Sequence, residues 1–386
     1  MEILIKTDQL KKAIFSIQSI CQKKTISEMT QNIELEIEKK NINIKSTDLE
    51  IYVEVNIEIE EILQITNNSK TIINGKFFFD IIKDIEDQYI KIQINNNNCF
   101  IKSKHSNIRI NILNTESFPI NELKIENILK INNKHIVKSI HYCGQISQTN
   151  IEKTTTPTIL FQFTNTEFKA TATDGHCLSH IKINKATAMI DEEFSFLISK
   201  KASMDCKKII ETFTKENEET FLGRSSNKIT FTGNNFIISI KSINEKFPNY
   251  QKILQNEYKT SITCQATSFI KITKRLSLFT ENKFLPATMK IEEETNKILF
   301  KIENNTIGKI EEDLIFTKEE KDNNKNEKSD ISVAIFPPYI LKGAQETQNN
   351  NDTINIKISA QQKPILFYQT EDNIEQYFLV MPMIAI

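Results

Sequence analysis

One pattern of helices and strands occurs three times along this chain of 386 residues. In each occurrence, a helix with apolar residues at 3.6-residue spacing precedes alternating strands, a second helix and further strands. The apolar stripes of the first helices are Leu10, Ala13, Ile14, Ile17 and Ile20; Ile136, Ile140 and Cys143; and Phe269, Ile272, Leu276 and Phe279. This repeat predicts an α+β fold of three similar domains, residues 1–122, 123–255 and 256–386, each with two helices packed on β-sheets.

Two short landmarks recur at matching places in the units. Thr47-Asp48, Thr173-Asp174 and Asn304-Asn305 each follow an early strand. Phe118-Pro119 and Phe247-Pro248 close the first two units. A β-sandwich array with incidental helices is the alternative fold. We favour three mixed domains because the helices recur at matching positions.

Composition limits the class of protein. Lys and Arg number 49 and Asp and Glu number 50, so the net charge excludes a polybasic nucleic-acid protein. The six cysteines form no C-x-x-C pair and indicate reduced, mostly buried thiols of a cytosolic protein. The N-terminus lacks the apolar core of a signal peptide, and no run approaches the roughly 18 apolar residues that span a bilayer. We expect a soluble, cytoplasmic protein without a membrane partner.

Basic residues gather on the polar faces and first turns of the predicted helices. They are Lys11, Lys12, Lys23, Lys24, Lys76, Lys83, Lys134, Lys138, Lys200, Lys201, Lys207, Lys208, Lys271, Lys274, Arg275 and Lys342. A single lysine on a helix face usually serves solvation. Recurrence at helix starts in three units, without interleaved aromatic residues, favours contact with phosphates without base readout.

The stretch from Thr171 to His180 holds the most reactive residue types. Asp174-Gly175 predicts a tight turn between paired strands, because this dipeptide accepts positive φ. Asp174, His176 and His180 also suit a metal-dependent hydrolase or nuclease, which is the alternative function. No glycine-rich phosphate loop, G-x-S-x-G or H-E-x-x-H accompanies them, so the sequence favours a protein without catalytic residues, metal or cofactor.

The chain resembles the bacterial DNA sliding clamp, the beta subunit of DNA polymerase III. The resemblance is carried by Ala172 to His176, Phe247 to Tyr250 and Val380 to Met383, with weaker matches at Lys76 to Ile81 and Asn282 to Phe284. It implies a non-catalytic processivity factor in DNA replication. Two subunits associate head to tail into a ring of six domains, and helices line the hole that encircles duplex DNA of any sequence.

The resemblance also implies the sites. A cleft between the second and third domains binds a peptide of the replicative polymerase, the clamp loader and other replication and repair proteins. The matching positions are Thr173, Gly175, His176, Cys177, Leu178, Pro248, Lys252, Ile253, Leu379, Val380, Met381, Pro382 and Met383. Basic residues of the hole correspond to Lys24, Lys76, Lys200 and Lys201. The homodimer interface corresponds to Ile108, Leu278 and Phe279.

Some positions depart from the family pattern. Cys177 stands where arginine is common, and Lys153 and Thr156 replace arginine and leucine. Residues 384–386, Ile-Ala-Ile, follow Met383 where some members have a basic residue and leucine. We therefore expect a less cationic cleft. The stretch from Tyr377 to Ile386 contains no charged residue, which favours an apolar cleft. The alternative is a final core strand, but this explains Phe378 to Val380 only.

Overall fold

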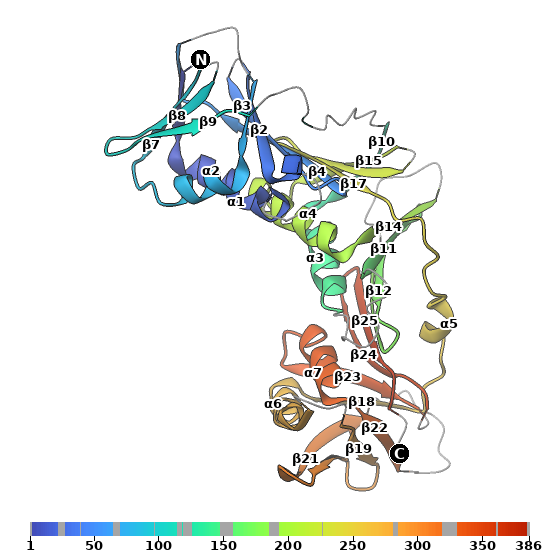
Figure 1. The fold of residues 1–386 in the computed structure, drawn as a ribbon. Coiled ribbons are helices and arrows are strands. Elements are labelled where there is room, and N and C mark those ends of the chain that lie inside the picture. The colour runs from blue at the N-terminus through green and yellow to red at the C-terminus, as the bar shows by residue number, and fades with distance from the viewer. Residues whose placement is uncertain are drawn as a thin grey trace. The chain divides into compact units, whose positions relative to one another are not determined.

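The computed structural model divides the chain into two compact units (Figure 1). Unit 1 comprises residues 1–140 and 186–244, and unit 2 comprises residues 141–185 and 245–386. The structure describes residues 2–21, 28–38, 40–64, 70–95, 97–113, 118, 126–146, 157–184, 193–225, 227–280, 285–318, 330–359 and 362–383. No helix among these residues has the length and apolar character needed to cross a membrane. The three-domain bounds remain a prediction.

Unit 1 holds the first repeat and part of the second. Its elements are β1 (Glu2–Lys6), α1 (Thr7–Cys21), η1 (Glu28–Gln31), β2 (Asn32–Glu38), β3 (Asn41–Thr47), β4 (Ile51–Glu58), β5 (Glu61–Gln64), β6 (Lys70–Asn74), α2 (Gly75–Lys83), β7 (Tyr89–Ile94), β8 (Asn98–Lys102), β9 (Asn107–Asn111), β10 (Glu126–Asn132), the part of α3 (Asn133–Gly144) up to residue 140, β14 (Phe194–Ser199), α4 (Lys200–Phe213), β15 (Glu219–Ser225), β16 (Lys228–Thr232) and β17 (Phe236–Lys241). One sheet has the order β5-β1-β7-β8-β9, and a second has the order β10-β15-β16-β17-β4-β3-β2-β6.

Unit 2 holds the rest of the second repeat and the third. Its elements are β11 (Thr158–Phe163), β12 (Glu167–Thr173), β13 (Cys177–Asn184), α5 (Gln251–Leu254), β18 (Thr260–Gln265), α6 (Ala266–Ser277), η3 (Leu278–Thr280), β19 (Ala287–Glu292), β20 (Lys297–Asn304), β21 (Gly308–Lys318), β22 (Ile331–Ile335), α7 (Pro337–Glu346), β23 (Thr353–Ile358), β24 (Ile365–Glu371) and β25 (Ile374–Val380). Its strands are ordered β11-β12-β13-β25-β24-β23-β18-β21-β20-β19-β22.

The local sequence explains where the helices begin. The Asn74 side chain accepts the Phe77 N–H at 2.9 Å, and the Ser199 hydroxyl accepts the Ala202 N–H at 3.0 Å, so each caps a second helix. The third, α7, begins with proline, whose missing N–H costs nothing in a first turn. The predicted stripe of α1 is buried from Leu10 to Ile20. These starts confirm the α+β reading over a β-sandwich with incidental helices.

One turn is built the same way in all three repeats. The Asp174 Oδ1 accepts the N–H groups of residues 176 and 177, the Asp48 Oδ1 accepts those of residues 50 and 51, and the Asn304 Oδ1 accepts those of residues 306 and 307. A short side-chain acceptor that replaces backbone partners makes such a turn. Gly175 has φ +86°, and Leu49 at the matching place has φ +73°. The predicted Asp174-Gly175 turn is confirmed.

A backbone hydrogen bond to an edge strand also recurs in all three repeats. After the last strand of each repeat, one backbone N–H pairs with an edge strand: Leu113 with the Ile72 carbonyl at 2.9 Å, Ile243 with Leu197 at 2.7 Å, and Met383 with Ala334 at 2.8 Å. Leu113, Ile243 and Met383 are therefore equivalent residues. With the turns, they fix which residues of β9, β17 and β25 correspond.

Candidate functional site

One face of the unit 2 sheet carries a row of three leucines, here called the leucine row. Leu178 of β13 lies opposite Leu379 of β25, and Leu379 lies opposite Leu366 of β24. All three are buried and form one apolar cluster with Tyr250. The other face of the sheet is turned toward α7, where the Phe367 ring lies against Gly343. Alternate residues of a strand thus divide between a helix-covered face and the leucine row.

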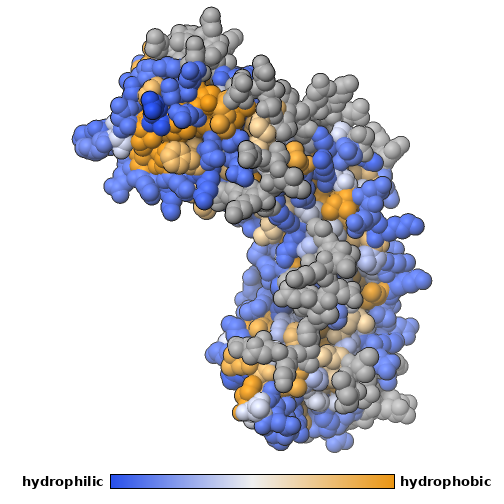
Figure 2. Space-filling view, in the orientation of Figure 1, coloured by the Kyte–Doolittle hydropathy of each residue, from blue (hydrophilic) through white to orange (hydrophobic). Residues whose placement is uncertain are grey.

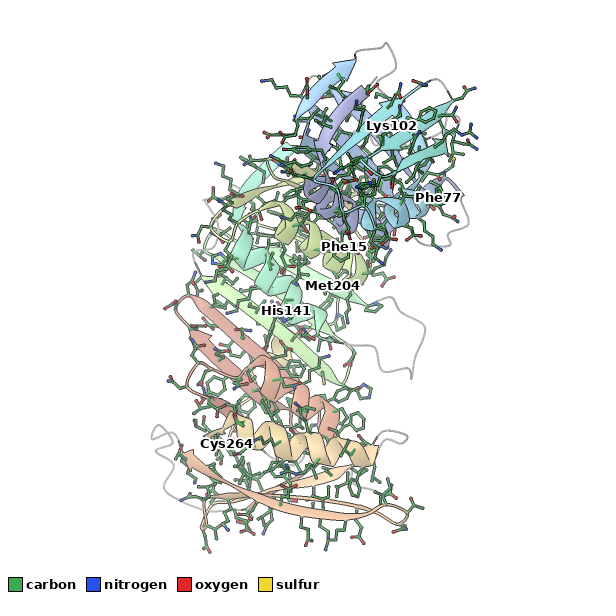
Figure 3. The ribbon with its side chains drawn as sticks, turned by 90° about the vertical axis from the view of Figure 1, so that its left-hand side faces the viewer. Phe15, Phe77, Lys102, His141, Met204 and Cys264 are labelled. Atoms are coloured by element: carbon green, nitrogen blue, oxygen red, sulfur yellow. The ribbon has the colours of Figure 1, made fainter. Side chains whose placement is uncertain are left out.

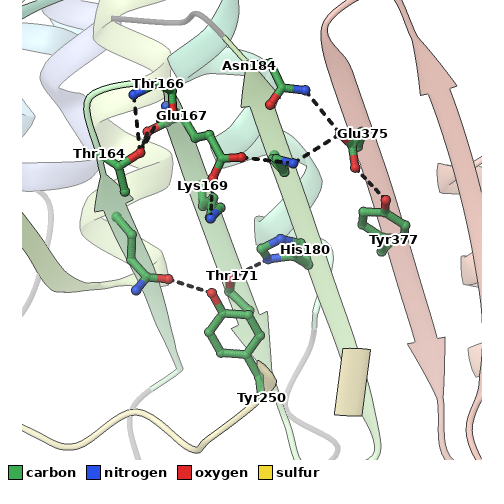
Figure 4. Close-up of polar contacts among 12 residues, drawn as sticks. Thr164, Thr166, Glu167, Lys169, Thr171, His180, Asn184, Tyr250, Glu375 and Tyr377 are labelled. Carbon is green, nitrogen blue, oxygen red and sulfur yellow. Dashed lines mark hydrogen bonds and ion pairs between the residues drawn. The ribbon is translucent and has the colours of Figure 1, made fainter. Parts of the chain in front are cut away.

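A chain segment that includes α5 covers the leucine row. Phe247, Ile253, Leu254 and Tyr258 of this segment pack against the cluster. The Tyr250 hydroxyl donates to Gln162 Oε1 at 2.6 Å and fastens the segment to β11 (Figure 4). Pro248 and Lys252 of the same segment are exposed. This segment, residues 247–258, is here called the lip. Its apolar side chains face the leucine row, and its polar side chains face solvent.

His180 lies beneath this lip and is almost completely buried. Its Nδ1 is 2.8 Å from the Thr171 hydroxyl, and its ring centroid is 5.3 Å from that of Tyr250 and 6.0 Å from that of Tyr377 (Figure 4). Burial, with Lys169 nearby, lowers the pKa of His180 to about 3. A neutral, sandwiched imidazole supports the lip and is poorly suited to proton transfer near neutral pH.

The alternative function, a metal-dependent hydrolase or nuclease, is not supported. Asp174 Oδ1 is occupied by two backbone N–H groups of its own turn. His176 is exposed at the turn, whereas His180 is buried against tyrosines. No group of three His, Cys, Asp or Glu side chains among the described residues could hold a metal ion. The close spacing of Asp174 and His176 suggested a metal site, but it belongs to a turn that also occurs at Asp48 and Asn304.

The end of the chain borders the leucine row. The Met381 N–H donates to the His176 carbonyl at 2.8 Å, and the Met381 side chain is 39 % exposed. Pro382 and Met383 are half-buried, as is Thr173. Of the predicted cleft residues, Leu178 and Leu379 belong to the leucine cluster, and Ile253 packs against it. Thr173, Gly175, His176, Met381, Pro382 and Met383 lie at the end of the β13–β25 pair, and Pro248 and Lys252 lie on the covering segment.

Two predicted cleft residues differ from the others in burial. Cys177 and Val380 lie opposite one another in the β13–β25 pair and are buried. Because neighbouring strand residues alternate, both belong to the helix-covered face of the sheet. Burial, with Asp174 nearby, raises the pKa of the Cys177 thiol. Cys177 therefore contributes packing behind the leucine row.

Beyond His180, the same face becomes charged. Lys182 forms ion pairs with Glu167 at 3.0 Å and Glu375 at 3.3 Å, and Glu375 accepts a hydrogen bond from the Tyr377 hydroxyl at 2.6 Å (Figure 4). These partners hold the pKa of Glu167 below its usual value, with the Lys169 ammonium as the largest cause. The face therefore changes along the strands from leucines to tyrosines and histidine, and then to paired charges.

The equivalent face of unit 1 is polar. Strands β4 and β17 pair as β13 and β25 do, but Tyr52 and Ser239 occupy the places of Leu178 and Leu379. The Lys241 N–H donates to the Glu50 carbonyl at 2.9 Å, as Met381 does to His176. Nearby, Lys45 pairs with Glu34 and Glu36. The two faces have the same backbone arrangement. Only the face in unit 2 carries apolar side chains at these positions, and this row of leucines is its apolar floor.

The predicted basic residues have different surroundings. Lys24 lies outside the described residues. Lys76 is exposed at the start of α2, and Lys200 is half-buried at the start of α4. Lys201 forms an ion pair with Asp48, whose side chain is only 4 % exposed, so its charge is balanced within unit 1. Lysines at helix starts thus serve more than one role.

Helices α1 and α4 also meet through a lysine that the site prediction omitted. The Lys208 ammonium donates to the Phe15 carbonyl and lies 3.8 Å from the Phe15 ring centroid. Figure 3 shows Phe15 and Met204 on these helices, and both are exposed. Burial lowers the pKa of Lys208. The helix surface of unit 1 therefore mixes apolar and basic side chains.

The residues predicted at a dimer interface lie at surfaces of both units. Ile108, on edge strand β9, is half-buried. Leu278 is 60 % exposed, and Phe279 is half-buried. Phe77 of α2 is 54 % exposed, and Figure 2 shows hydrophobic residues gathered on the part of unit 1 that carries α2 and β7 to β9. Exposed apolar surface of this kind marks contact sites.

Sequence reasoning missed several residues of the covered face. Tyr250, Leu366, Tyr368, Tyr377 and His180 all contribute to it. The period-2 alternation of Ile365 to Tyr368 could have assigned Leu366 and Tyr368 to one face. Only the pairing of β24 with β25 places them beside Leu379. The predicted departures at Lys153, Thr156 and residues 384–386, and the weaker match at 282–284, lie outside the described residues.

Comparisons with known proteins agree with this architecture. Residues 1–123 match the family model of the DNA polymerase III beta subunit, N-terminal domain. The beta sliding clamp of Rickettsia felis is 22 % identical over 393 residues, which cover 99 % of each chain. That of Mycoplasma genitalium is 27 % identical over 303 residues, which cover 73 % of this chain and 76 % of that protein.

Solved structures share the fold along the whole chain. The DNA polymerase III beta subunit of Thermotoga maritima has a TM-score of 0.86 at 16 % identity, and the Pseudomonas aeruginosa sliding clamp bound to griselimycin has a TM-score of 0.87 at 15 % identity. Each comparison covers 100 % of both chains. Both of the curated relatives are named beta sliding clamps, in agreement with the resemblance that the sequence motifs indicate. The chain is therefore similar along its whole length to bacterial beta sliding clamps, and its first 123 residues match the N-terminal domain of the DNA polymerase III beta subunit.

Proposed function

We propose that this sliding clamp encircles duplex DNA as a head-to-tail homodimer and holds the replicative polymerase, the clamp loader and other partners through the leucine row. The observation that carries the partner site is the contrast between the two equivalent faces. At one strand pairing Leu178 meets Leu379, and at the other Tyr52 meets Ser239. The apolar floor is therefore not required by the fold. An apolar floor with a methionine rim suits adaptable binding of several peptides.

Two open sheet edges support the ring. Strand β9 is the last strand of its sheet in unit 1. Strand β21 pairs with β20 along Gly308 to Ile315 and with β18 only from Phe316 to Lys318, so most of its other edge has no strand partner among the described residues. The equivalent strands already pair within one chain, as β17 with β4 and β25 with β13. The third pairing of this kind requires a second copy.

The repeats predict the register of that pairing. Arg109 precedes Leu113 by four residues, as Ser239 precedes Ile243 and Leu379 precedes Met383. On the other strand, Lys309 pairs with the residue before the Asn304 turn, as Tyr52 and Leu178 do at theirs. Arg109 of one copy therefore lies opposite Lys309 of the next, and Ile108 lies opposite Ile310.

This register places like charges opposite one another, and a local partner offsets them. The Lys309 ammonium is 2.6 Å from a Glu311 carboxylate oxygen. The pair of Ile108 and Ile310 lies on the sheet face that the helices cover, where apolar residues pack. Leu278 and Phe279, together with Phe77 of the other copy, supply further exposed apolar surface to the same contact.

A disulfide experiment tests the ring and its register. Residues directly opposite in antiparallel strands lie within the Cα separation of about 4.4–6.8 Å that a disulfide needs. Arg109→Cys with Lys309→Cys is expected to yield a covalent dimer closed at both interfaces on mild oxidation. Arg109→Cys with Asp313→Cys shifts the partner by four residues and is the control. Cross-linking of the control alone, or of neither variant, would overturn the proposed pairing.

Encirclement itself is tested by topology. The clamp, loaded by its clamp loader on nicked circular DNA, is expected to stay bound at a salt concentration that removes simple phosphate contacts. Linearising the circle should release it rapidly. Equal retention on circular and linear DNA, with a steep salt dependence, would show ordinary electrostatic binding. A Leu379→Asp variant should lose binding to both the clamp loader and the polymerase, and it should therefore no longer be loaded onto the circle.

A further inference from the structure

The leucine row continues into a basic residue. Leu366 of β24 lies opposite Lys357 of β23, and Lys357 lies opposite Ser261 of β18. The row across the sheet is therefore Leu178, Leu379, Leu366, Lys357 and Ser261. Strand alternation keeps all five on the face that the lip borders. An extended chain lying across the leucines in this direction reaches Lys357 next.

Two hydroxyl groups lie at this end of the row, and a third belongs to the lip. The Tyr368 hydroxyl is 3.2 Å from Ser261 Oγ, and the Lys357 ammonium lies 4.6 Å from the Tyr368 ring centroid. Tyr258 packs against the leucine cluster with Tyr368, and its hydroxyl is buried without a hydrogen-bond partner among the described residues. Burial raises the pKa of Tyr258 to about 12, so the group is a neutral donor. A buried hydroxyl without a partner is costly and calls for an explanation.

The charge of Lys357 differs from that of its neighbours on the same face. Lys182 and Lys169 are each paired with a carboxylate. Lys357 forms no ion pair with a carboxylate among the described residues, and its half-buried side chain lies over an aromatic ring. A cation–π contact holds the ammonium in place and leaves its N–H donors available.

We propose that Lys357, Ser261, Tyr258 and Tyr368 form a carboxylate subsite at the end of the leucine row. Its occupant is an acidic side chain of the same partner peptide whose apolar residues cover Leu178, Leu379 and Leu366. The inference rests on the proposed partner-binding function. The ammonium supplies a charge-assisted bond, and the hydroxyls supply donors to the second carboxylate oxygen. We expect an acidic peptide because the subsite continues the leucine row and Lys357 has no carboxylate partner in the part of the chain that the structure describes.

Selection from a random heptapeptide library on phage tests the subsite without a known ligand. The full-length clamp is immobilised as wild type, as Lys357→Gln and as Lys271→Gln. Lys271 is an exposed lysine of α6, which packs on the other face of the sheet, so this control loses the same charge elsewhere. Wild type and Lys271→Gln should enrich peptides with apolar residues and Asp or Glu at one fixed spacing.

On Lys357→Gln, the apolar residues should persist while the acidic residue falls to its frequency in the library. An acidic preference that survives in this variant, or is absent from wild type, would overturn the subsite and leave the leucine row intact. Enrichment of no peptide on wild type over uncoated wells would overturn the partner-binding function as well.

A selected peptide gives a second readout. Replacing its acidic residue with the matching amide should weaken binding to wild type about tenfold, as expected for a charge-assisted bond. The same replacement should have no effect on Lys357→Gln. Tyr258→Phe should weaken the acidic peptide and leave the amide peptide unchanged. Equal losses for both peptides would show a structural effect only and would contradict the subsite.

Discussion

The Met381 N–H donates to the His176 carbonyl oxygen at 2.8 Å. The same bond occurs in unit 1 between the Lys241 N–H and the Glu50 carbonyl at 2.9 Å. The backbone therefore repeats at this point, while the side chains around it change from charged to apolar. The unit 1 copy therefore shows which features of the unit 2 face come from the repeated backbone and which come from its side chains.

Two tyrosines of the lip offer a matched pair of variants. Tyr250→Phe removes the hydroxyl that bonds Gln162, and the change should lower the free energy of unfolding by about 1 kcal/mol. Tyr258→Phe removes a buried hydroxyl without a partner among the described residues, so stability should stay the same or rise. Urea unfolding of both variants measures the difference. Equal destabilisation would contradict the assigned contacts.

Gly175 provides a test of backbone strain alone. Its φ is +86°, and an added Cβ would meet no atom within 4 Å. Gly175→Ala should therefore lower the free energy of unfolding by roughly 1–2 kcal/mol through conformation only. Leu49→Gly, at the equivalent turn, makes the reverse change and should not destabilise unit 1 by a similar amount. Thermal and urea unfolding distinguish the two results.

The buried His180 makes stability depend on pH. Its folded-state pKa of about 3 lies below the ordinary value near 6.5, so the unfolded chain binds a proton first as the pH falls. The stability that this histidine contributes is present above about pH 6.5 and is lost progressively toward pH 3, by roughly 2 kcal/mol at pH 5. Replacing His180 with Gln should flatten the dependence between pH 7 and pH 5. An unchanged slope in urea unfolding would refute the assignment.

The thiols predict a simple labelling pattern. All six cysteines are buried and none is in a disulfide. Burial raises the pKa of Cys21 to about 11 and that of Cys99 to about 12, so thiolate is scarce near neutral pH. A thiol reagent should react slowly with the native protein and with six groups after denaturation. Rapid reaction of Cys177 in the native protein would place its side chain in the cleft after all.

Much of the frame was predictable from sequence because its determinants are local. Apolar residues at 3.6 spacing predicted α1, and capping residues fixed the starts of α2 and α4. The turns at Asp48, Asp174 and Asn304 depend on one side chain and its own backbone. The short α5 was missed, because four residues provide no periodic signal.

The candidate site was only partly predictable. Leu178 and Leu379 were assigned through the resemblance, whereas Leu366 and Lys357 join them through strand pairs between distant segments. The sequence also could not show that Lys201 is paired with Asp48, more than 150 residues away. Period-2 alternation states which residues of a strand share a face, but not which face is covered or which strand lies beside it. The sequence by itself determined the repeated elements and turns, and the tertiary structure decided the leucine row and its basic end, because register joins residues that no local pattern connects.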